Sequence, residues 1–277
     1  MLRETVDGSL IDDEGRLIFC SLERFVRDIG KGDCCFVCGT SPSEKIFNNE
    51  HILPDWILKR YGLYKQFVTL PNGHRYRYDK YKVPCCQDCN SLLGQKIEVP
   101  IRDLIAGGYE KVCEHLKNKG AWIFFVWMCL VYLKTHLKDR GLRLHLDRRM
   151  IEGQIADMYD WEDLHFAHCV ARIAFTNAIL DYKALGSIFV LPVLRNEAIS
   201  NFDFAEDFDF LDFYQGYSFL IRFEDFAIVA VLNDSCGAIQ GNMSRIEKIS
   251  GPLTSLQLRE IFCHFGYANI LLKERPV

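Results

Sequence analysis

The sequence predicts an α+β protein, with a small cysteine-rich domain near the N-terminus and a larger α+β region after it. Three observations support this class: two Cys-x-x-Cys pairs, a hairpin signal between them, and runs of helical and then β-like pattern beyond about residue 105. The 277 residues suffice for one large domain or two modest ones. A hydrophobic content of 49% with 25% charged residues is typical of a globular protein rather than a disordered one.

The two cysteine pairs predict a structural zinc site. A two-residue spacer lets both sulfurs of a pair reach one tetrahedral Zn²⁺. Only one register gives two such pairs, because Cys34 and Cys85 have no cysteine three residues further on. A reduced cluster without metal and a redox-active pair are the alternatives, although redox chemistry requires one pair at a helix N-terminus, not two matched pairs. The expected zinc ligands are Cys35, Cys38, Cys86 and Cys89.

Cysteine usage and hydropathy also predict a compartment. The chain has 12 cysteines, and its first residues, MLRETVDGSLIDDEG, contain no apolar signal-peptide region. We therefore expect reduced thiols and a cytoplasmic location. The longest apolar run, residues 121–133, is shorter than the roughly 20 residues that span a bilayer. It predicts a buried helix, and no membrane partner is expected.

Between the cysteine pairs lies a Glu-His dipeptide, and an asparagine follows the second pair directly. Glu50 offers an oxygen ligand for Mg²⁺, and His51 offers a base that titrates near neutral pH. On an extended chain, adjacent side chains point to opposite faces. Glu50 can therefore serve a metal while His51 addresses a water molecule. A zinc ion shared by the two cysteine pairs would bring this dipeptide close to Asn90.

The segment between the pairs predicts a helix and a hairpin. Residues 55–63 follow Pro54 and precede a glycine-containing turn, which favours a short helix. Residues 65–70 and 74–83 are typical of strands around a Pro-Asn-Gly turn. After Asn90, a helix is expected to end at Pro100.

This order of motifs resembles the HNH endonucleases of the ββα-metal superfamily. The resemblance covers about residues 33–100 and is closest to the variant with a four-cysteine zinc knuckle, found in phage Holliday-junction resolvases and in restriction and phage-defence nucleases. It implies hydrolysis of phosphodiester bonds in DNA, with His51 as general base and with Glu50 and Asn90 holding a catalytic metal. No second histidine follows Asn90, so the resemblance implies Mg²⁺ or Mn²⁺ rather than catalytic zinc.

A further departure from the family pattern lies at Glu50, and two other positions, Asn72 and Glu98, are weaker candidates for the site. Glu50 is one methylene longer than the aspartate often found there. Asn72 is only a loose candidate for the middle asparagine of the motif, and its Asn-Gly turn explains it equally well. Glu98, two helical turns beyond Asn90, is either a further site residue or an exposed helix carboxylate.

A net charge of −4 does not by itself indicate a nucleic-acid-binding protein, but basic residues gather locally. On a strand, Arg75 and Arg77 share one face while Tyr76 and Tyr78 share the other. This pattern favours contact with phosphates, and a solvated hairpin is the alternative. A second basic stretch covers residues 134–149. The nucleic-acid-binding candidates are Arg75, Arg77, Lys80, Lys82, Lys59 and Arg60.

We expect three consecutive parts: a helical lead-in over residues 1–32, the nuclease domain over 33–104 and an α+β domain over 105–277. The last part predicts helices within 111–137, 161–184 and 256–265, and strands within 187–193, 217–223, 226–232 and 267–272. Its expected role is regulation, homodimer formation or partner binding. The acidic stretch 202–213 is interpreted as a loop, an inhibitory element or a partner contact.

The sequence predicts a metal-dependent endonuclease, of the kind that serves as an effector in anti-phage or restriction systems. Two alternatives remain open. One is a zinc-knuckle protein that binds nucleic acid without cleaving it. The other is a nuclease effector that is silent until a partner or second messenger activates it.

Overall fold

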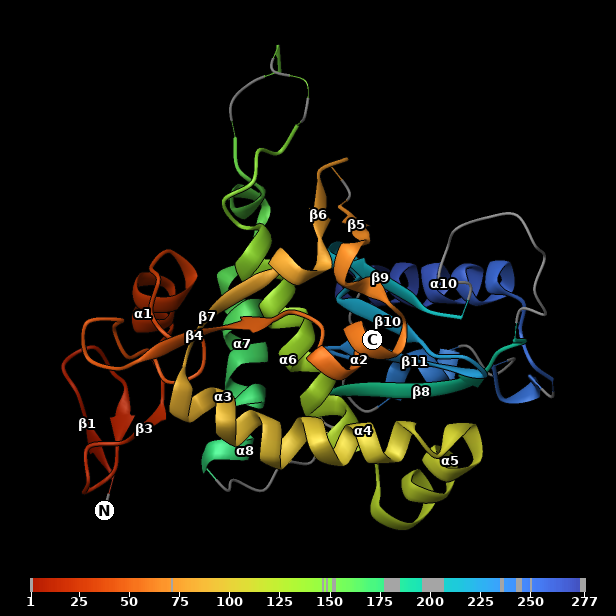
Figure 1. Ribbon diagram of the computed structural model, residues 1–277, viewed down its shortest axis with the longest axis horizontal. Helices are drawn as coiled ribbons and strands as arrows, with labels where there is room; N and C mark the ends of the chain where they lie inside the picture. Colours follow the sequence, from red (N-terminus) through yellow and green to blue (C-terminus); the bar gives the residue numbers. More distant parts are fainter. Residues whose placement is uncertain are drawn as a thin grey trace. The chain divides into compact units, whose positions relative to one another are not determined.

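Figure 1 shows the computed structural model of the chain. It describes residues 2–70, 72–145, 147, 149–150, 153–176, 185–195, 207–234, 237–242, 246–249 and 251–274. The structure mixes helices and sheets, which confirms the α+β class. It contains two compact units: residues 1–99 with 129–178, and residues 100–128 with 179–277. These units differ from the three consecutive segments expected above, because the apolar helix α6 (Trp122–Asp139) contributes its first part to one unit and its second part to the other.

The N-terminal part of the first unit starts with β-structure rather than with a helix. Strands β1 (Arg3–Glu4), β2 (Leu10–Ile11) and β3 (Leu17–Phe19) form an antiparallel sheet in that order. Gly8 and Gly15 adopt positive φ at the two turns, a conformation that glycine favours and that interrupts a helix. The expected helical lead-in is restricted to α1 (Leu22–Arg24) and the π-helix η1 (Phe25–Gly30).

A two-stranded sheet followed by a helix forms the centre of the first unit. Strand β4 (Phe47–His51) pairs antiparallel with β7 (Lys82–Cys86), so that His51 lies opposite Lys82. Helix α3 (Gln87–Leu93) begins directly after β7. The chain therefore has the β-β-α order that positions residues 50, 51 and 90 on neighbouring elements.

Between β4 and β7 the chain forms the expected helix and hairpin. Helix α2 (Asp55–Arg60) and the short 3₁₀ helix η2 (Leu63–Lys65) are followed by β5 (Phe67–Thr69) and β6 (Arg75–Arg77), which pair antiparallel. This confirms the hairpin. The single strand expected over 74–83 is wrong, because the 3₁₀ helix η3 (Tyr78–Lys80) separates β6 from β7.

The helix expected to end at Pro100 continues past it. A π-helical turn, η4 (Gly94–Glu98), leads into α4 (Val99–Ile105), and the amide of Val99 donates to the main-chain oxygen of Gly94. Pro100 is the second residue of α4. Proline has no N–H to donate, and the π-helical turn directly before it shifts the hydrogen-bond pattern, so the helix continues past Pro100.

The rest of the first unit is helical. The second part of α6 is followed by η5 (Ile155–Met158), α7 (Trp161–Ala171) and α8 (Ile173–Thr176). The side chain of Asp160 caps α7 by accepting from the amide of Glu162. The helical part of the prediction for 161–184 is confirmed as far as residue 176, and residues 177–184 lie outside the described residues.

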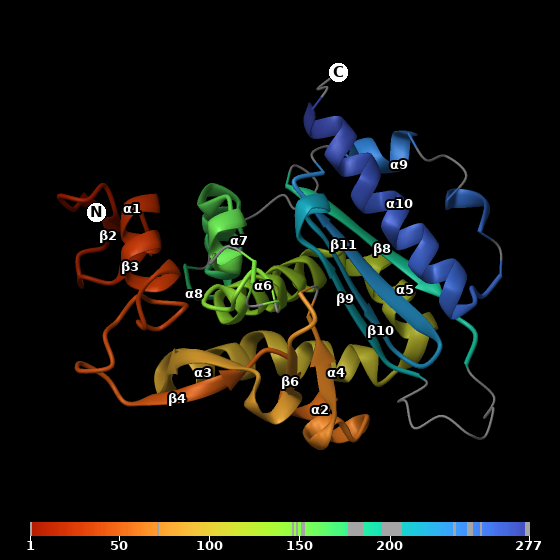
Figure 2. The same cartoon turned by 90° about the horizontal axis from the view of Figure 1, so that it is seen from above.

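A four-stranded antiparallel sheet forms the second unit, in the order β8 (Gly186–Pro192), β11 (Phe226–Leu232), β10 (Ser218–Arg222) and β9 (Asp209–Phe213). Helix α10 (Ser255–Glu274) lies along one face of it (Figure 2). Leu220 and Val229 of the sheet share a buried core with Leu258 and Phe265 of α10. This unit also contains α5 (Gly108–Lys119), η7 (Tyr214–Gly216), α9 (Ala238–Asn242), η9 (Ile246–Lys248), most of α4 and the first part of α6.

Two predictions in this unit were wrong. Residues 209–213 of the acidic stretch form an edge strand, β9, and not a loop, because they pair with β10 along their whole length. Residues 202–206 lie outside the described residues. The strand expected over 267–272 belongs to α10, because Asn269 and Leu272 continue the inward face of that helix toward the sheet. Within the described residues no helix alone is long and apolar enough to cross a membrane, and α5 and α6 pass that test only as a pair bent by 113°.

Candidate metal centre and acid–base site

The four cysteines expected to bind zinc come together in the first unit. The sulfurs of Cys35, Cys38, Cys86 and Cys89 all lie within 4.8 Å of one another. Cys35 and Cys38 flank a tight turn in which the amide of Gly39, at φ +70°, donates to the oxygen of Cys35. Cys86 is the N-cap of α3, and Cys89 lies in its first turn. The first pair is thus supplied by a turn and the second by a strand–helix junction.

The distances in this cluster fit a tetrahedral metal ion. Zinc–sulfur bonds of about 2.3 Å place the sulfurs of a tetrahedron about 3.8 Å apart. Cys38 Sγ and Cys86 Sγ are separated by 3.8 Å. The four thiols are close enough to share protons. Hydrogen bonds from Cys38 and Cys85 lower the pKa of Cys35, and the hydrogen bond between Cys89 and Cys35 raises the pKa of Cys89. The cluster can hold a metal ion such as Zn²⁺.

Two helices of the first unit brace the first cysteine pair. His168 of α7 is fully buried, and its Nε2 lies 3.1 Å from the main-chain oxygen of Val37, between the two cysteines. Arg140, just after α6, donates to the oxygens of Ile29 and Gly32, which precede the pair. His168 is therefore a core histidine with a main-chain partner.

His51 lies at the end of β4 in a partly buried position. Burial lowers its pKa below the ordinary value, and the nearby Lys82 lowers it further, while Glu50 acts in the opposite direction. The ring of Tyr64 stands perpendicular to the imidazole, with centroids 6.4 Å apart, and the Tyr64 hydroxyl donates to Asp55. A histidine with a lowered pKa is neutral at pH 7, which is the form that can accept a proton.

Glu50 points away from His51, into a buried charged cluster. Its exposed fraction is only 8%. Lys134 of α6 donates from Nζ to Glu50 Oε1 at 3.2 Å and to the main-chain oxygen of His51 at 2.8 Å. Glu98 Oε1 lies 3.8 Å from the same Nζ. Glu98 is therefore a member of this cluster and not an exposed helix carboxylate.

Sequence reasoning assigned Lys134 to a basic surface stretch, and this was wrong, because the side chain is only 2% exposed. Arg148 of the same stretch lies outside the described residues. A usable signal existed for Lys134. Three of its four helical neighbours at spacings of three and four, Leu130, Val131 and Leu137, are apolar and buried, which favours the buried side of α6 for Lys134.

Asn90 occupies the second turn of α3. Its Nδ2 donates to Asn48 Oδ1 at 3.2 Å, and Asn48 precedes Glu50 by two residues on the same strand. Residues two apart on a strand face the same side of the sheet. Asn90 and Glu50 are thus directed to one face of β4, although the structure pairs Asn90 with Asn48, and Glu50 with Lys134. The bond to Asn48 uses the amide nitrogen and leaves the Asn90 oxygen as an acceptor.

The candidate nucleic-acid-binding residues differ in their exposure and in whether they already form ion pairs. Arg75, Arg77 and Lys80 are exposed on the β5–β6 hairpin and the segment after it. Arg77 forms a two-pronged ion pair with Asp79, and Arg75 lies over the ring of Phe67 at 5.0 Å. The remaining three candidates are exposed Lys59, which pairs with Asp55 at 2.6 Å, exposed Arg60, and half-buried Lys82 beside His51.

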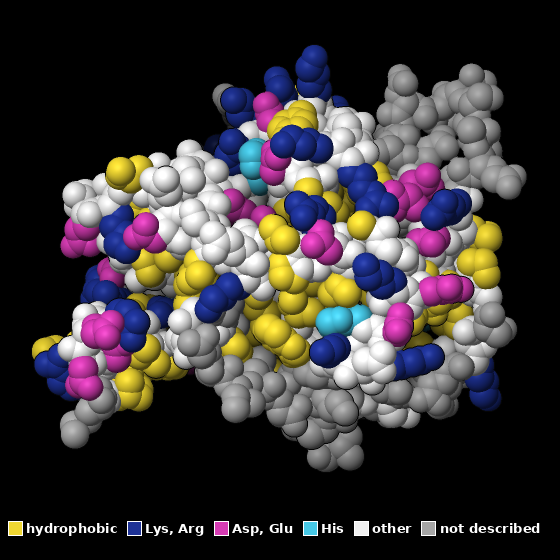
Figure 3. All heavy atoms as spheres, turned by 60° about the horizontal axis from the view of Figure 1, so that its bottom comes forward, with side chains coloured by type: hydrophobic (Ala, Val, Ile, Leu, Met, Phe, Trp, Pro, Cys, Tyr) yellow, Lys and Arg dark blue, Asp and Glu magenta, His cyan; other side chains and the backbone are white. Residues whose placement is uncertain are grey.

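The structure joins the hairpin to the second basic stretch. Asn72 Nδ2 at the hairpin turn donates to the main-chain oxygen of Arg143 at 2.7 Å, and Lys138 Nζ lies 5.5 Å from the centroid of the Tyr76 ring. We call Arg75, Arg77, Lys80, Lys138 and Arg143 the hairpin surface. Asn72 is explained by this contact and by its bond to the amide of His74. On the face drawn in Figure 3, cationic and anionic side chains are interspersed, so basic character is local.

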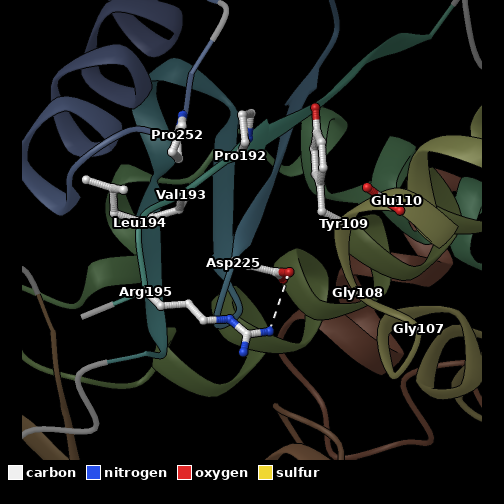
Figure 4. A pocket seen from close by; sticks show the side chains of 10 residues that line it. All are labelled: Gly107, Gly108, Tyr109, Glu110, Pro192, Val193, Leu194, Arg195, Asp225 and Pro252. Carbon is white, nitrogen blue, oxygen red and sulfur yellow. Dashed lines mark ion pairs between the residues drawn. The ribbon is translucent and has the colours of Figure 1, made fainter. Parts of the chain in front are cut away.

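A pocket of about 530 Å³ lies in the second unit, apart from these residues in the chain (Figure 4). Its wall includes Tyr109, Pro192 and the ion pair between Arg195 and Asp225, whose closest atoms are 3.5 Å apart. Glu110 also lines the pocket, and none of its lining residues belongs to the site predicted from the sequence.

Comparisons with protein-family models, with curated proteins and with solved structures found no match to this chain.

Proposed function

We propose that this protein is an HNH-type endonuclease that hydrolyses phosphodiester bonds of DNA. The observation that supports this most directly is the β4–β7–α3 arrangement closed by the cysteine cluster, with a partly buried histidine of lowered pKa at the end of β4. The four cysteines hold structural Zn²⁺ in this proposal. His51 is the general base, which takes a proton from the water that attacks the phosphate.

The donor chemistry beside His51 fits a hard divalent cation. Glu50 and Glu98 supply carboxylate oxygens, and Asn90 supplies an amide oxygen that its bond to Asn48 does not use. Mg²⁺ or Mn²⁺ would be held by Glu50 and Asn90, and would neutralise charge on the phosphate and the leaving oxygen. Lys134 fixes the main chain of His51 through its carbonyl oxygen, and so orients the base.

The hairpin surface is proposed to bind the DNA backbone. Its members come from two stretches far apart in sequence that meet at the contact between Asn72 and Arg143. The guanidinium groups of Arg75 and Arg77, exposed on one face of β6, suit phosphate contacts, which position a duplex without reading its sequence. Because Arg77 and Lys59 already pair with carboxylates, most of the binding energy is assigned to Arg75 and Lys80.

The test uses zinc-loaded protein and supercoiled plasmid with added Mg²⁺ or Mn²⁺. Wild type should nick the plasmid, and His51→Ala should abolish nicking while zinc content and DNA binding stay unchanged. His264→Ala is the matched control, because His264 is an exposed histidine of α10 in the second unit. Nicking retained by His51→Ala would refute the assignment. DNA binding without nicking by wild type would favour an inactive binding protein.

A nuclease that is silent until activated is a second candidate. The observation that favours it is the pairing of Glu50 with Lys134, because a proposed metal ligand already carries a cation. Under this alternative, wild type would bind DNA and zinc yet cleave only after a partner or small molecule is added.

A further inference from the structure

Lys134 is a buried cation placed directly at the proposed catalytic residues. Lysine is almost never fully buried unless it is paired, since removing its charge from water is costly. Here the side chain is 2% exposed, and its ammonium group bonds both to Glu50 and to the main chain of His51. The packing of α6 thus supplies a positive charge at the position where the proposed function needs a metal ion.

The charge balance of the cluster is incomplete. Glu50 and Glu98 are two carboxylates, and Lys134 provides one positive charge between them. Full ionisation of both acids would leave one negative charge in a largely buried site. Adding a divalent cation would instead leave one net positive charge, because its two positive charges would join the ammonium group that is already there.

A divalent ion bound to Glu50 would be strongly repelled by the ammonium group of Lys134. Both would lie within a few ångströms of the same carboxylate, and Coulomb repulsion at such distances is weakly screened in a buried site. The metal can be held tightly only if the Lys134 side chain moves away from Glu50.

We propose that Lys134 is a positioning residue that competes with the catalytic metal: its ammonium group is the resident counter-ion of Glu50, and it sets the affinity of the site for Mg²⁺ or Mn²⁺. This inference rests on the proposed function only in placing the metal at Glu50. It supplies a physical basis for a nuclease with low activity at limiting metal. Displacement of Lys134 from Glu50 would then activate the enzyme.

The experiment measures metal binding directly, without DNA. Zinc-loaded full-length protein is titrated with Mn²⁺, and free Mn²⁺ is followed by electron paramagnetic resonance. Lys134→Met removes the charge at nearly constant volume, and Lys134→Gln also keeps a donor for the His51 carbonyl. Both variants should bind one Mn²⁺ at least ten-fold more tightly than wild type. Zinc content and circular dichroism verify that each variant is folded.

Two further variants test whether the gain in Mn²⁺ affinity depends on the pairing of Lys134 with Glu50. Adding Glu50→Gln to either Lys134 variant should abolish the gain, because the carboxylate that Lys134 neutralises is then absent. Lys138→Met is the matched control: it removes a lysine one turn further along α6 that lies over the Tyr76 ring, and its Mn²⁺ affinity should equal that of wild type.

Unchanged or weaker Mn²⁺ binding in a folded Lys134 variant would overturn the proposal, as would a gain that survives Glu50→Gln. These outcomes are separate from the failure of the proposed function. An Mn²⁺ gain without plasmid cleavage by wild type or by the Lys134 variants would uphold the role of Lys134 and refute the nuclease. Cleavage that depends on His51 with no Mn²⁺ gain would do the reverse.

Discussion

Substitution of Glu98 by glutamine should change how the stability of the protein depends on pH. The Glu98 side chain is 20% exposed. Burial raises its pKa from the ordinary 4.5 to about 7; Lys134 opposes this rise, and the neighbouring Glu50 adds to it. Glutamine has nearly the same shape and cannot ionise. The variant therefore isolates the free energy of ionising this one side chain inside the fold.

The sign follows from the direction of the shift. A carboxyl group whose pKa is raised by folding stabilises the fold while it is protonated, and this contribution is lost as the pH rises from the unfolded to the folded value. One pKa unit corresponds to about 1.4 kcal/mol, so the rise to about 7 corresponds to about 3 kcal/mol in total. Between pH 5.5 and 8.5 about 2 kcal/mol of this should be measurable.

The assay is urea unfolding of zinc-loaded wild type and Glu98→Gln at pH 5.5 and 8.5, in buffers free of other divalent metals. The stability of the variant relative to wild type should increase by about 2 kcal/mol at the higher pH. Glu23→Gln, at an exposed position of α1, is the control: its stability relative to wild type should be the same at both pH values. Parallel pH profiles for Glu98→Gln and wild type would refute the burial argument.

Three other predictions follow from the site. Cys86→Ser should lose zinc and unfold the first unit, since structural zinc contributes about 10 kcal/mol or more. Cys85→Ala should keep one zinc per chain, measured by atomic emission. Equal zinc loss in both variants would contradict the assignment of Cys86 rather than Cys85 as a ligand. Lys82→Met should raise the pKa of His51 and move the acidic limb of the pH–rate profile to higher pH; an unmoved limb would contradict the influence of Lys82. Replacing Arg75 and Lys80 together by alanine should reduce the salt dependence of DNA binding by about two phosphate contacts, and Lys59→Ala, already paired with Asp55, should change it less.

Predictions that depended on local spacing agree best with the structure. The choice of Cys35, Cys38, Cys86 and Cys89 over Cys34 and Cys85 required only that two sulfurs three residues apart can reach one point. The hairpin at Asn72 depended on its turn residues, and β10 and β11 were recognisable as apolar stretches joined by Glu224 and Asp225. In each case the deciding interaction lies within a few residues of the signal.

Predictions that depended on how a segment packs were less successful. Pro100 does not end its helix, because η4 shifts the hydrogen-bond pattern before it. Residues 267–272 remain helical because α10 covers the sheet without a break. The edge strand β9 was missed because its acidic residues resemble a loop, and only its pairing with β10 makes it a strand. None of these partners can be identified from the segment alone.

Lys134 shows the same limit inside the candidate site, and it changes what the motif means. Glu50, His51 and Asn90 are close in motif order, so sequence reasoning assigned Glu50 and Asn90 to one metal and His51 to the attacking water. The structure adds a cation from α6, 84 residues after Glu50 in the chain, to the same carboxylate. A family motif specifies the residues that line a site, but it does not specify what the rest of the fold places against them. If the proposed metal binds at Glu50, a buried ammonium group and a divalent ion compete for one carboxylate, and the metal affinity of this site would then depend on the packing of α6 as much as on the motif itself.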